Sequence, residues 1–190
     1  MNQTPTNTKG WAEWLKLSTH DDEDLIALVQ ECARFALNFK AGGKARWLTL
    51  LGKSGTGKTH CARRLWNHTE KHSEWRKAAF VQSEVYWPAF VSELRSGEAY
   101  ARLHDMQKWP VLFLDDVGAE RDTTGFASEQ LNTLLGCRAD KWTILTSNLT
   151  LGQFRNVDAR IADRIIRYPN QFIEVNTKSY ALRNITLQTI

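Results

Sequence analysis

Short apolar runs suited to buried strands recur along the chain and alternate with segments of helical periodicity. The apolar runs fall at residues 47–51, 78–82, 111–115, 142–146 and 171–175. Helices are expected near residues 58–72, 84–95, 98–108, 126–139 and 151–167. Strands that are separated by helices are joined by right-handed crossovers, so they run parallel and both faces of the sheet are covered. The pattern predicts an α/β fold with a parallel sheet.

The first 43 residues have a different pattern. Residues 1–10 are polar and rich in Thr and Asn, which predicts a loose tail. Residues 21–39 place apolar side chains at helical spacing. Two interpretations of this helix are open: packing on the edge of the domain, and docking on a partner protein. We therefore divide the chain into an N-terminal tail and helix, 1–43, and a main domain, 44–190.

Composition and charge narrow the classes of function. The 190 residues are 42% hydrophobic and 24% charged, with a net charge of +4, which favours a polyanionic partner without requiring one. Three widely spaced cysteines argue against a disulfide framework and a zinc site. No apolar stretch approaches the roughly 18 residues of a membrane span, and no secretory signal is present, so we expect a cytoplasmic protein without a membrane partner. Most of the eight tryptophans are expected in the core, with base stacking by Trp11, Trp14 or Trp87 as the alternative.

The sequence GKSGTGKT, residues 52–59, follows the first apolar run and fits the pattern G-x-x-x-x-G-K-[ST]. Its glycines let backbone amides turn toward a phosphate, Lys58 reaches the β- and γ-phosphates, and the Thr59 hydroxyl ligates Mg²⁺. The helix that starts at Lys58 directs its positive end at the same anion. The residues expected to bind the nucleotide are Gly52, Ser54, Gly55, Thr56, Gly57, Lys58, Thr59 and His60.

The sequence VLFLDDVGAERD, residues 111–122, is a buried strand that ends in two carboxylates. Asp115 is expected to hold Mg²⁺ through its water shell, and Asp116 to orient or deprotonate the attacking water. Asp116 is one methylene shorter than the glutamate common at this position, so slow hydrolysis is expected, with Glu120 as a weaker candidate for the same role. A small-molecule kinase does not need the second acid, and a GTP switch would carry an Asn-Lys-x-Asp sequence that we do not find.

Two further polar features follow in chain order. WTILTSNLT ends a strand in Asn148, whose amide can hydrogen-bond the attacking water or the γ-phosphate. DARIADRIIR places Arg160 and Arg164 four residues apart on one helix face, with Arg167 three residues further along. Two interpretations of these arginines are open: a solvated basic face, and an arginine finger that enters the nucleotide site of a neighbouring subunit.

The segments GKSGTGKTHCARRL, VLFLDDVGAERD, FASEQLNTLLGCR, ILTSNL and ARIADRI resemble, in kind and order, the AAA+ ATPases. They are most similar to the helicase-loader clade typified by bacterial DnaC and DnaI, with the transposition ATPase IstB as a near relative. The resemblance covers roughly residues 44–183. It implies a P-loop NTPase fold of the AAA+ (ASCE) type, with five parallel strands in the order 5-1-4-3-2 and no C-terminal helical lid domain. It also implies ATP and Mg²⁺ at a subunit interface, with Arg164 as the finger and Arg160 as second choice.

The leading hypothesis is a slow, Mg²⁺-dependent ATPase that loads or remodels a replicative DNA helicase on single-stranded DNA when replication starts. The resemblance implies a homo-oligomeric ring or spiral, in which oligomerisation or DNA stimulates hydrolysis. Two alternatives are open: a transposition ATPase that acts on duplex DNA, and a weakly hydrolysing, nucleotide-dependent protein adaptor. The segment 83–108 is the region to test for DNA contact, and it carries Arg95, Arg102, Lys108, Tyr86 and Trp87.

Overall fold

The computed structural model of the protein describes residues 5, 7–72 and 84–179. Within these residues, five parallel strands form one sheet in the order β2-β3-β4-β1-β5. The strands are β1 (Trp47–Gly52), β2 (Glu84–Tyr86), β3 (Val111–Val117), β4 (Trp142–Ser147) and β5 (Gln171–Val175). Counted from the other edge, this is the predicted order 5-1-4-3-2, which is therefore confirmed.

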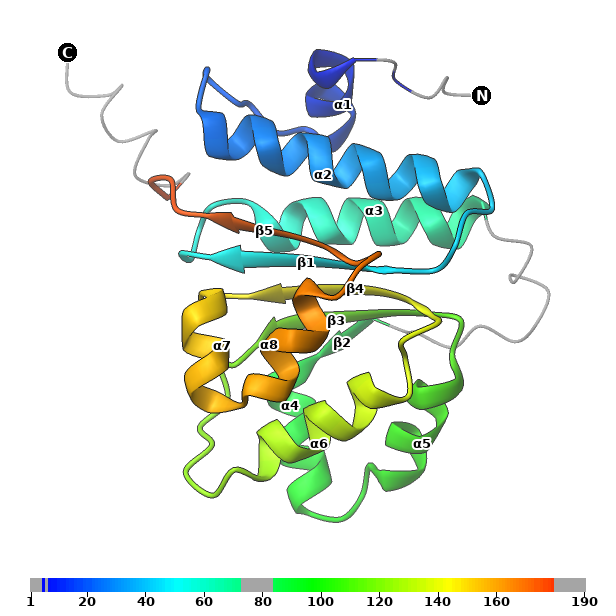
Figure 1. Ribbon diagram of the computed structural model, residues 1–190, viewed down its shortest axis with the longest axis vertical. Coiled ribbons are helices and arrows are strands. Elements are labelled where there is room, and N and C mark those ends of the chain that lie inside the picture. Colours follow the sequence, from blue (N-terminus) through cyan, green and yellow to red (C-terminus); the bar gives the residue numbers. More distant parts are fainter. Residues whose placement is uncertain (1–4, 6, 73–83, 180–190) are drawn as a thin grey trace.

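Helices cover both faces of the sheet (Figure 1). One face carries α2 (Glu23–Lys40) and α3 (Lys58–His72), with α1 (Thr8–Leu15) packed on both of these helices. The other face carries α4 (Trp87–Arg95), α5 (Tyr100–Lys108), α6 (Phe126–Gly136), α7 (Leu151–Val157) and α8 (Ala159–Ile166). None of the helices in the described ranges is both long enough and apolar enough to cross a bilayer.

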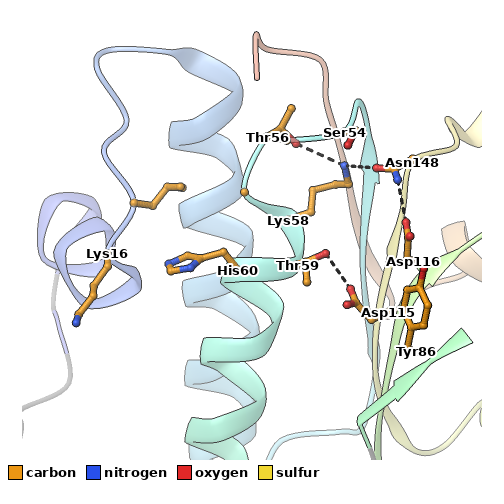
Figure 2. A pocket seen from close by; sticks show the side chains of 13 residues that line it. Lys16, Ser54, Thr56, Lys58, Thr59, His60, Tyr86, Asp115, Asp116 and Asn148 are labelled. Carbon is orange, nitrogen blue, oxygen red and sulfur yellow. Dashed lines mark hydrogen bonds between the residues drawn. The ribbon is translucent and has the colours of Figure 1, made fainter. Parts of the chain in front are cut away.

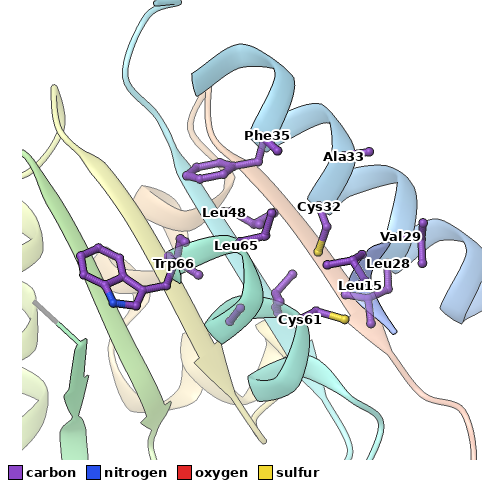
Figure 3. Packing of buried hydrophobic residues seen from close by; sticks show 14 of the residues in the cluster. Leu15, Leu28, Val29, Cys32, Ala33, Phe35, Leu48, Cys61, Leu65 and Trp66 are labelled. Carbon is purple, nitrogen blue, oxygen red and sulfur yellow. The ribbon is translucent and has the colours of Figure 1, made fainter. Parts of the chain in front are cut away.

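Each face of the sheet has its own apolar core, because successive side chains of a strand point to opposite faces. In β1, Leu48 and Leu50 belong to the core under α2 and α3, whereas Trp47 and Leu51 belong to the core under α4 to α8. Figure 3 shows α2 and α3 closing over the first core, with Phe35 and Leu65 among its members. The helix predicted at residues 21–39 thus packs on the domain, as the first interpretation expected, and α2 contacts the edge strand β5.

Residues 8–10 are not part of a loose tail. They form the first turn of α1, where the side chain of Asn7 caps the helix by accepting a 2.8 Å hydrogen bond from the backbone of Gly10. Such a side-chain acceptor satisfies one of the free N–H groups at a helix start. The tail expectation was wrong here because a helix with three buried residues, Trp11, Ala12 and Leu15, follows at once.

Two further sequence-based boundaries need correction. Residues 84–86 form β2 rather than the start of a helix, and α4 begins at Trp87 with Pro88 in its first turn. The predicted strand at 78–82 lies outside the described residues. The helix predicted at 151–167 is two helices, since Asp158 ends α7 and caps α8 by accepting from the Arg160 backbone at 2.9 Å.

Arg138, two residues after the end of α6, is fully buried and connects three elements. Its guanidinium donates to Thr143 Oγ1 at 3.0 Å and to the carbonyl oxygens of Met106 at 2.6 Å, Trp109 at 2.8 Å and Trp142 at 2.8 Å. These four acceptors are neutral, and burial lowers the pKa of Arg138 to about 9, with Asp140 opposing the shift. The side chain therefore joins the end of α5 to β4 through hydrogen bonds.

Candidate nucleotide-binding site

The carboxyl ends of β1, β3 and β4 meet at one edge of the sheet, where parallel sheets bind ligands. A pocket of about 530 Å³ opens there (Figure 2). Seven of the eight predicted nucleotide-binding residues line it, together with Asp115, Asp116 and Asn148. The eighth, Gly52, lies where β1 enters the loop. Three lining residues were not predicted: Lys16, Leu17 and Tyr86.

Gly52 fixes the start of the phosphate loop. Its backbone has a φ of 107°, and a Cβ atom there would collide with the backbone of Val175. The backbone N–H of Gly52 donates to Leu149 at 3.2 Å, and that of Lys53 donates to Val175 at 3.1 Å. Glycine is required because only it tolerates both this conformation and this approach. The loop therefore leaves β1 attached to the segments that follow β4 and end β5.

Lys58, the first residue of α3, is held inside the loop that precedes it. Its ammonium group donates to the carbonyl oxygens of Gly52 at 2.8 Å and Lys53 at 2.6 Å, and to the side-chain oxygen of Asn148 at 3.2 Å. Burial lowers the pKa of Lys58 to about 8, while the neighbouring aspartates oppose the shift. The loop thus presents a desolvated cation at the start of a helix, which is an arrangement that binds phosphate.

Asp115 is nearly buried at the end of β3 and receives three side chains. Its Oδ1 accepts from the hydroxyls of Thr59 at 2.8 Å and Thr146 at 2.7 Å, and its Oδ2 lies 3.4 Å from the Arg63 guanidinium. Arg63 was not predicted, although it lies one helical turn after Thr59 on the same face of α3. The hydroxyl of Thr59 and the carboxylate of Asp115 are hard oxygen donors that lie together, so this pair fits Mg²⁺.

Asp116 adopts a left-handed backbone conformation, with a φ of 61°. Its carboxylate accepts a 2.8 Å hydrogen bond from the Asn148 side chain, and its backbone N–H donates to Thr146 at 2.9 Å. Burial, and after it the charge of Asp115, raises the pKa of Asp116, whereas Lys58 and a hydrogen bond from Tyr86 act in the opposite direction. Such a backbone is uncommon outside glycine and is retained where function uses it.

Glu120 and the three tryptophans considered for base stacking do not line the pocket. The Glu120 carboxylate accepts from Trp87 Nε1 at 3.1 Å and from the Gly118 backbone at 2.9 Å, and it does not line the pocket. Base stacking by Trp11 or Trp87 is wrong as an interpretation, because these side chains are 3% and 0% exposed. Trp14 lies beneath a guanidinium, with Arg64 Cζ 5.5 Å from its ring centre.

The arginines of α8 do not enter the pocket of their own chain. Arg160 is exposed and pairs with Asp158 at 2.8 Å, while Arg164 donates to the side chain of Asn132 at 3.2 Å. Arg167 is exposed just after α8. The role of Arg164 or Arg160 as a finger for a neighbouring subunit thus stays a prediction.

The basic residues proposed for DNA contact make contacts within the chain. Arg95 lies 3.7 Å from Asp122, Arg102 lies 3.6 Å from Glu93, and Lys108 lies 3.3 Å from the His104 ring. DNA contact by this segment stays a prediction.

The strand order, the phosphate loop after β1, the acidic pair at β3 and the polar end of β4 define a P-loop NTPase domain of the AAA+ type. Residues 30–187 match the family described as IstB-like ATP binding protein. The chain belongs to this family.

Named relatives take part in DNA replication. The chain is 29% identical to the replicative helicase loader DnaI of Bacillus subtilis over 141 residues, which are 71% of this chain and 43% of that protein. The chain therefore spans less than half of that relative. A crystal structure of DnaI superimposes with a TM-score of 0.63 and 29% identity, covering 88% of this chain and 92% of that one.

Two more distant structures share the fold. A crystal structure of the DnaC helicase loader has a TM-score of 0.60 at 20% identity and covers 82% of this chain and 92% of that chain. The replication initiator DnaA, bound to AMPPCP and single-stranded DNA, has a TM-score of 0.59 at 17% identity and covers 87% of this chain and 51% of that chain.

Proposed function

We propose that the protein is a Mg²⁺-dependent ATPase that loads or remodels a replicative DNA helicase on single-stranded DNA when replication starts. The observation that carries the proposal is the convergence of Lys58, Asp115, Asp116 and Asn148 in one pocket at the carboxyl edge of the sheet. The similarity to DnaI supplies the partner class, a replicative helicase.

The pocket gives ATP an orientation. Lys58, Thr59 and the N-terminus of α3 attract the triphosphate, and Asp116 and Asn148 mark the end where the terminal phosphate is attacked. Figure 2 places Lys16 and His60 on the opposite side of Lys58 and Thr59 from this acidic end. The base and ribose therefore extend toward Lys16 and its neighbour Leu17.

Each polar side chain then has a defined task. Lys58 exchanges the loop carbonyls for phosphate oxygens, and Thr59 and Asp115 would hold Mg²⁺. The metal, when bound, neutralises charge on the phosphates. Asp116 orients or deprotonates the attacking water while Asn148 fixes its carboxylate. Because Asp116 is short, hydrolysis is slow.

Full activity requires a second subunit in this proposal. Among the described residues no arginine lines the pocket of its own chain, so in that part of the chain the charge that develops on the transferred phosphoryl group has no arginine partner. We assign that role to Arg164 of a neighbouring copy in a ring or spiral, with Arg160 as the alternative.

The test is ATP turnover per subunit measured against protein concentration, with no DNA, single-stranded DNA or duplex DNA. A rate that climbs with concentration and climbs again with single-stranded DNA supports the proposal. Stimulation by duplex DNA alone favours the second candidate, a transposition ATPase. The match to the IstB-like family is the observation that favours this candidate. A rate near zero under all conditions favours the nucleotide-dependent adaptor.

A further inference from the structure

The end of α1 is held by two side chains of α3, the helix that begins at the phosphate loop. His60 Nε2 lies 2.7 Å from the carbonyl oxygen of Leu15, and Arg64 Nε lies 2.8 Å from that of Trp14, to which a second guanidinium nitrogen of Arg64 also donates. A carbonyl only accepts, so Nε2 of His60 carries the proton. His60 and Arg64 are four residues apart and share one face of α3.

These bonds complete the hydrogen bonding at the end of α1. A helix leaves its last four carbonyl groups without partners inside the helix. The backbone N–H groups of Lys16 and Leu17 serve Glu13 and Ala12, at 3.0 and 2.9 Å. The carbonyls of Trp14 and Leu15 receive their donors from α3. The sequence of α1 has no basic residue in its last turn, so α3 also provides positive charge at this helix end.

The same contact places Leu17 in the pocket. Lys16 turns the chain at the end of α1 with a φ of 54°. Leu17 follows, is 5% exposed, and lines the pocket on the side assigned to the base and ribose. Its Cδ1 comes so close to the phosphate loop that a Cβ at Gly57 would meet it at 3.0 Å. The position of Leu17 in the pocket therefore depends on where α1 ends.

We propose that His60 and Arg64 are positioning residues that fix Leu17 and thereby set the affinity for the base and ribose of the nucleotide, but not for its triphosphate. The inference rests on the proposed nucleotide site. It gives His60 a task different from direct nucleotide binding: its ring holds α1, while its neighbour Thr59 faces Asp115.

The test compares the dissociation constants of two ligands, Mg²⁺–ATP and Mg²⁺–tripolyphosphate, which lacks base and ribose. The double variant His60→Ala/Arg64→Ala is expected to bind ATP about tenfold more weakly, roughly 1.4 kcal/mol, and tripolyphosphate as the wild type does. His60→Gln in the wild-type background keeps a donor and is expected to bind ATP nearly normally. Arg34→Ala, at an exposed residue of α2 that pairs with Glu31, is the matched control.

A second variant and thermal unfolding serve as controls for a folding defect in the double variant. Leu17→Ala leaves the hydrogen bonds of His60 and Arg64 in place and is expected to cause the same ATP-specific loss, whether or not the double variant folds. Equal weakening of both ligands, or none in either variant, overturns the inference. Wild-type protein that binds neither ligand, or Lys58→Ala protein that binds both normally, instead refutes the proposed nucleotide site, and the inference falls with it.

Discussion

Asn148 donates a 2.8 Å hydrogen bond from its side-chain amide to the carboxylate of Asp116. The amide oxygen accepts at the same time from Lys58 at 3.2 Å. This bridge is possible because β4 lies between β1 and β3, so the residue after β4 reaches both the phosphate loop and the acidic pair. Asn148 thereby links Lys58, which we propose binds phosphate, to Asp116, which we propose activates water.

Replacing Asn148 is expected to affect the chemical step more than binding. In Asn148→Ala the Asp116 carboxylate loses the donor that orients it, so kcat should fall by about tenfold to a hundredfold while the ATP dissociation constant changes less than about threefold. Steady-state hydrolysis and equilibrium binding measure the two quantities. The exposed Asn156→Ala on α7 serves as control. A loss confined to binding would contradict this role.

Asp116 is expected to set the acid limb of the rate profile. Its pKa is raised, chiefly by burial, and the general base acts only when deprotonated. The rate should therefore fall as pH decreases through a value above 3.8, the ordinary value for aspartate. Asp116→Asn should lower kcat about a hundredfold with ATP binding retained, and Asp116→Glu should raise kcat. The profile of kcat against pH measures this effect, with the exposed Asp105→Asn as control. An unchanged rate in Asp116→Asn would exclude Asp116 as the general base.

ATP binding should weaken as pH rises above about 8. The pKa of Lys58 is lowered to about 8 in the free protein, and a phosphate raises it, so the complex holds more protons than the free protein above that pH. The dissociation constant should increase by up to about tenfold per pH unit there. In the free protein, the contribution of Lys58 to the free energy of unfolding increases as pH rises from about 8 to 10.5. In this range the unfolded chain binds more protons than the folded chain. Lys58→Ala should bind ATP weakly and without this dependence; equal slopes would contradict the assignment.

Arg138 is expected to be among the most sensitive positions for stability. Arg138→Ala removes four hydrogen bonds and takes the Arg138 donor away from buried oxygens of Met106, Trp142 and Thr143, so the free energy of unfolding should fall by about 4 kcal/mol. Urea denaturation measures this quantity. Arg138→Lys should recover part of the loss. Arg34→Ala, at the surface, should change the free energy by less than about 0.5 kcal/mol.

An arginine finger supplied by a neighbouring subunit can be detected by mixing two variants of the protein. Arg164→Ala should hydrolyse ATP at least about a hundredfold more slowly at every protein concentration. Lys58→Ala subunits carry Arg164 but should bind ATP only weakly, so adding them to Arg164→Ala subunits should restore part of the activity. Arg160→Ala tests the second candidate in the same way. An absence of restoration for both arginines would place the missing charge elsewhere.

The elements of the site that are encoded locally could be predicted from the sequence. The loop residues follow from a fixed spacing, and the acidic pair follows an apolar run, so Lys58, Thr59 and Asp115 were found without knowledge of packing. The contact of His60 with Leu15 and that of Arg63 with Asp115 depend on how α3 lies against α1 and β3, which spacing does not define.

The two helix boundaries that the sequence analysis missed have local signals, but the apolar periodicity outweighed them. The apolar periodicity from 151 to 167 continues through Asp158, yet this residue is a preferred helix cap. Likewise, Pro88 is typical of the first turn of a helix and marks where α4 begins after β2. Both signals concern single residues, whereas the periodicity extends over several turns.

The attachment of Gly52 and Lys53 to the segment after β4 and to the end of β5 has a consequence for the rate of binding. A flexible loop loses conformational entropy when it closes on a phosphate, and that loss opposes association. Here the start of the phosphate loop is held when the sheet forms, because Gly52 and Lys53 are hydrogen-bonded to Leu149 and Val175. The remaining rearrangement is the release of the Lys58 ammonium from its carbonyl partners. We therefore expect the rate of nucleotide binding to depend on the Lys58 side chain more than on closure of the loop.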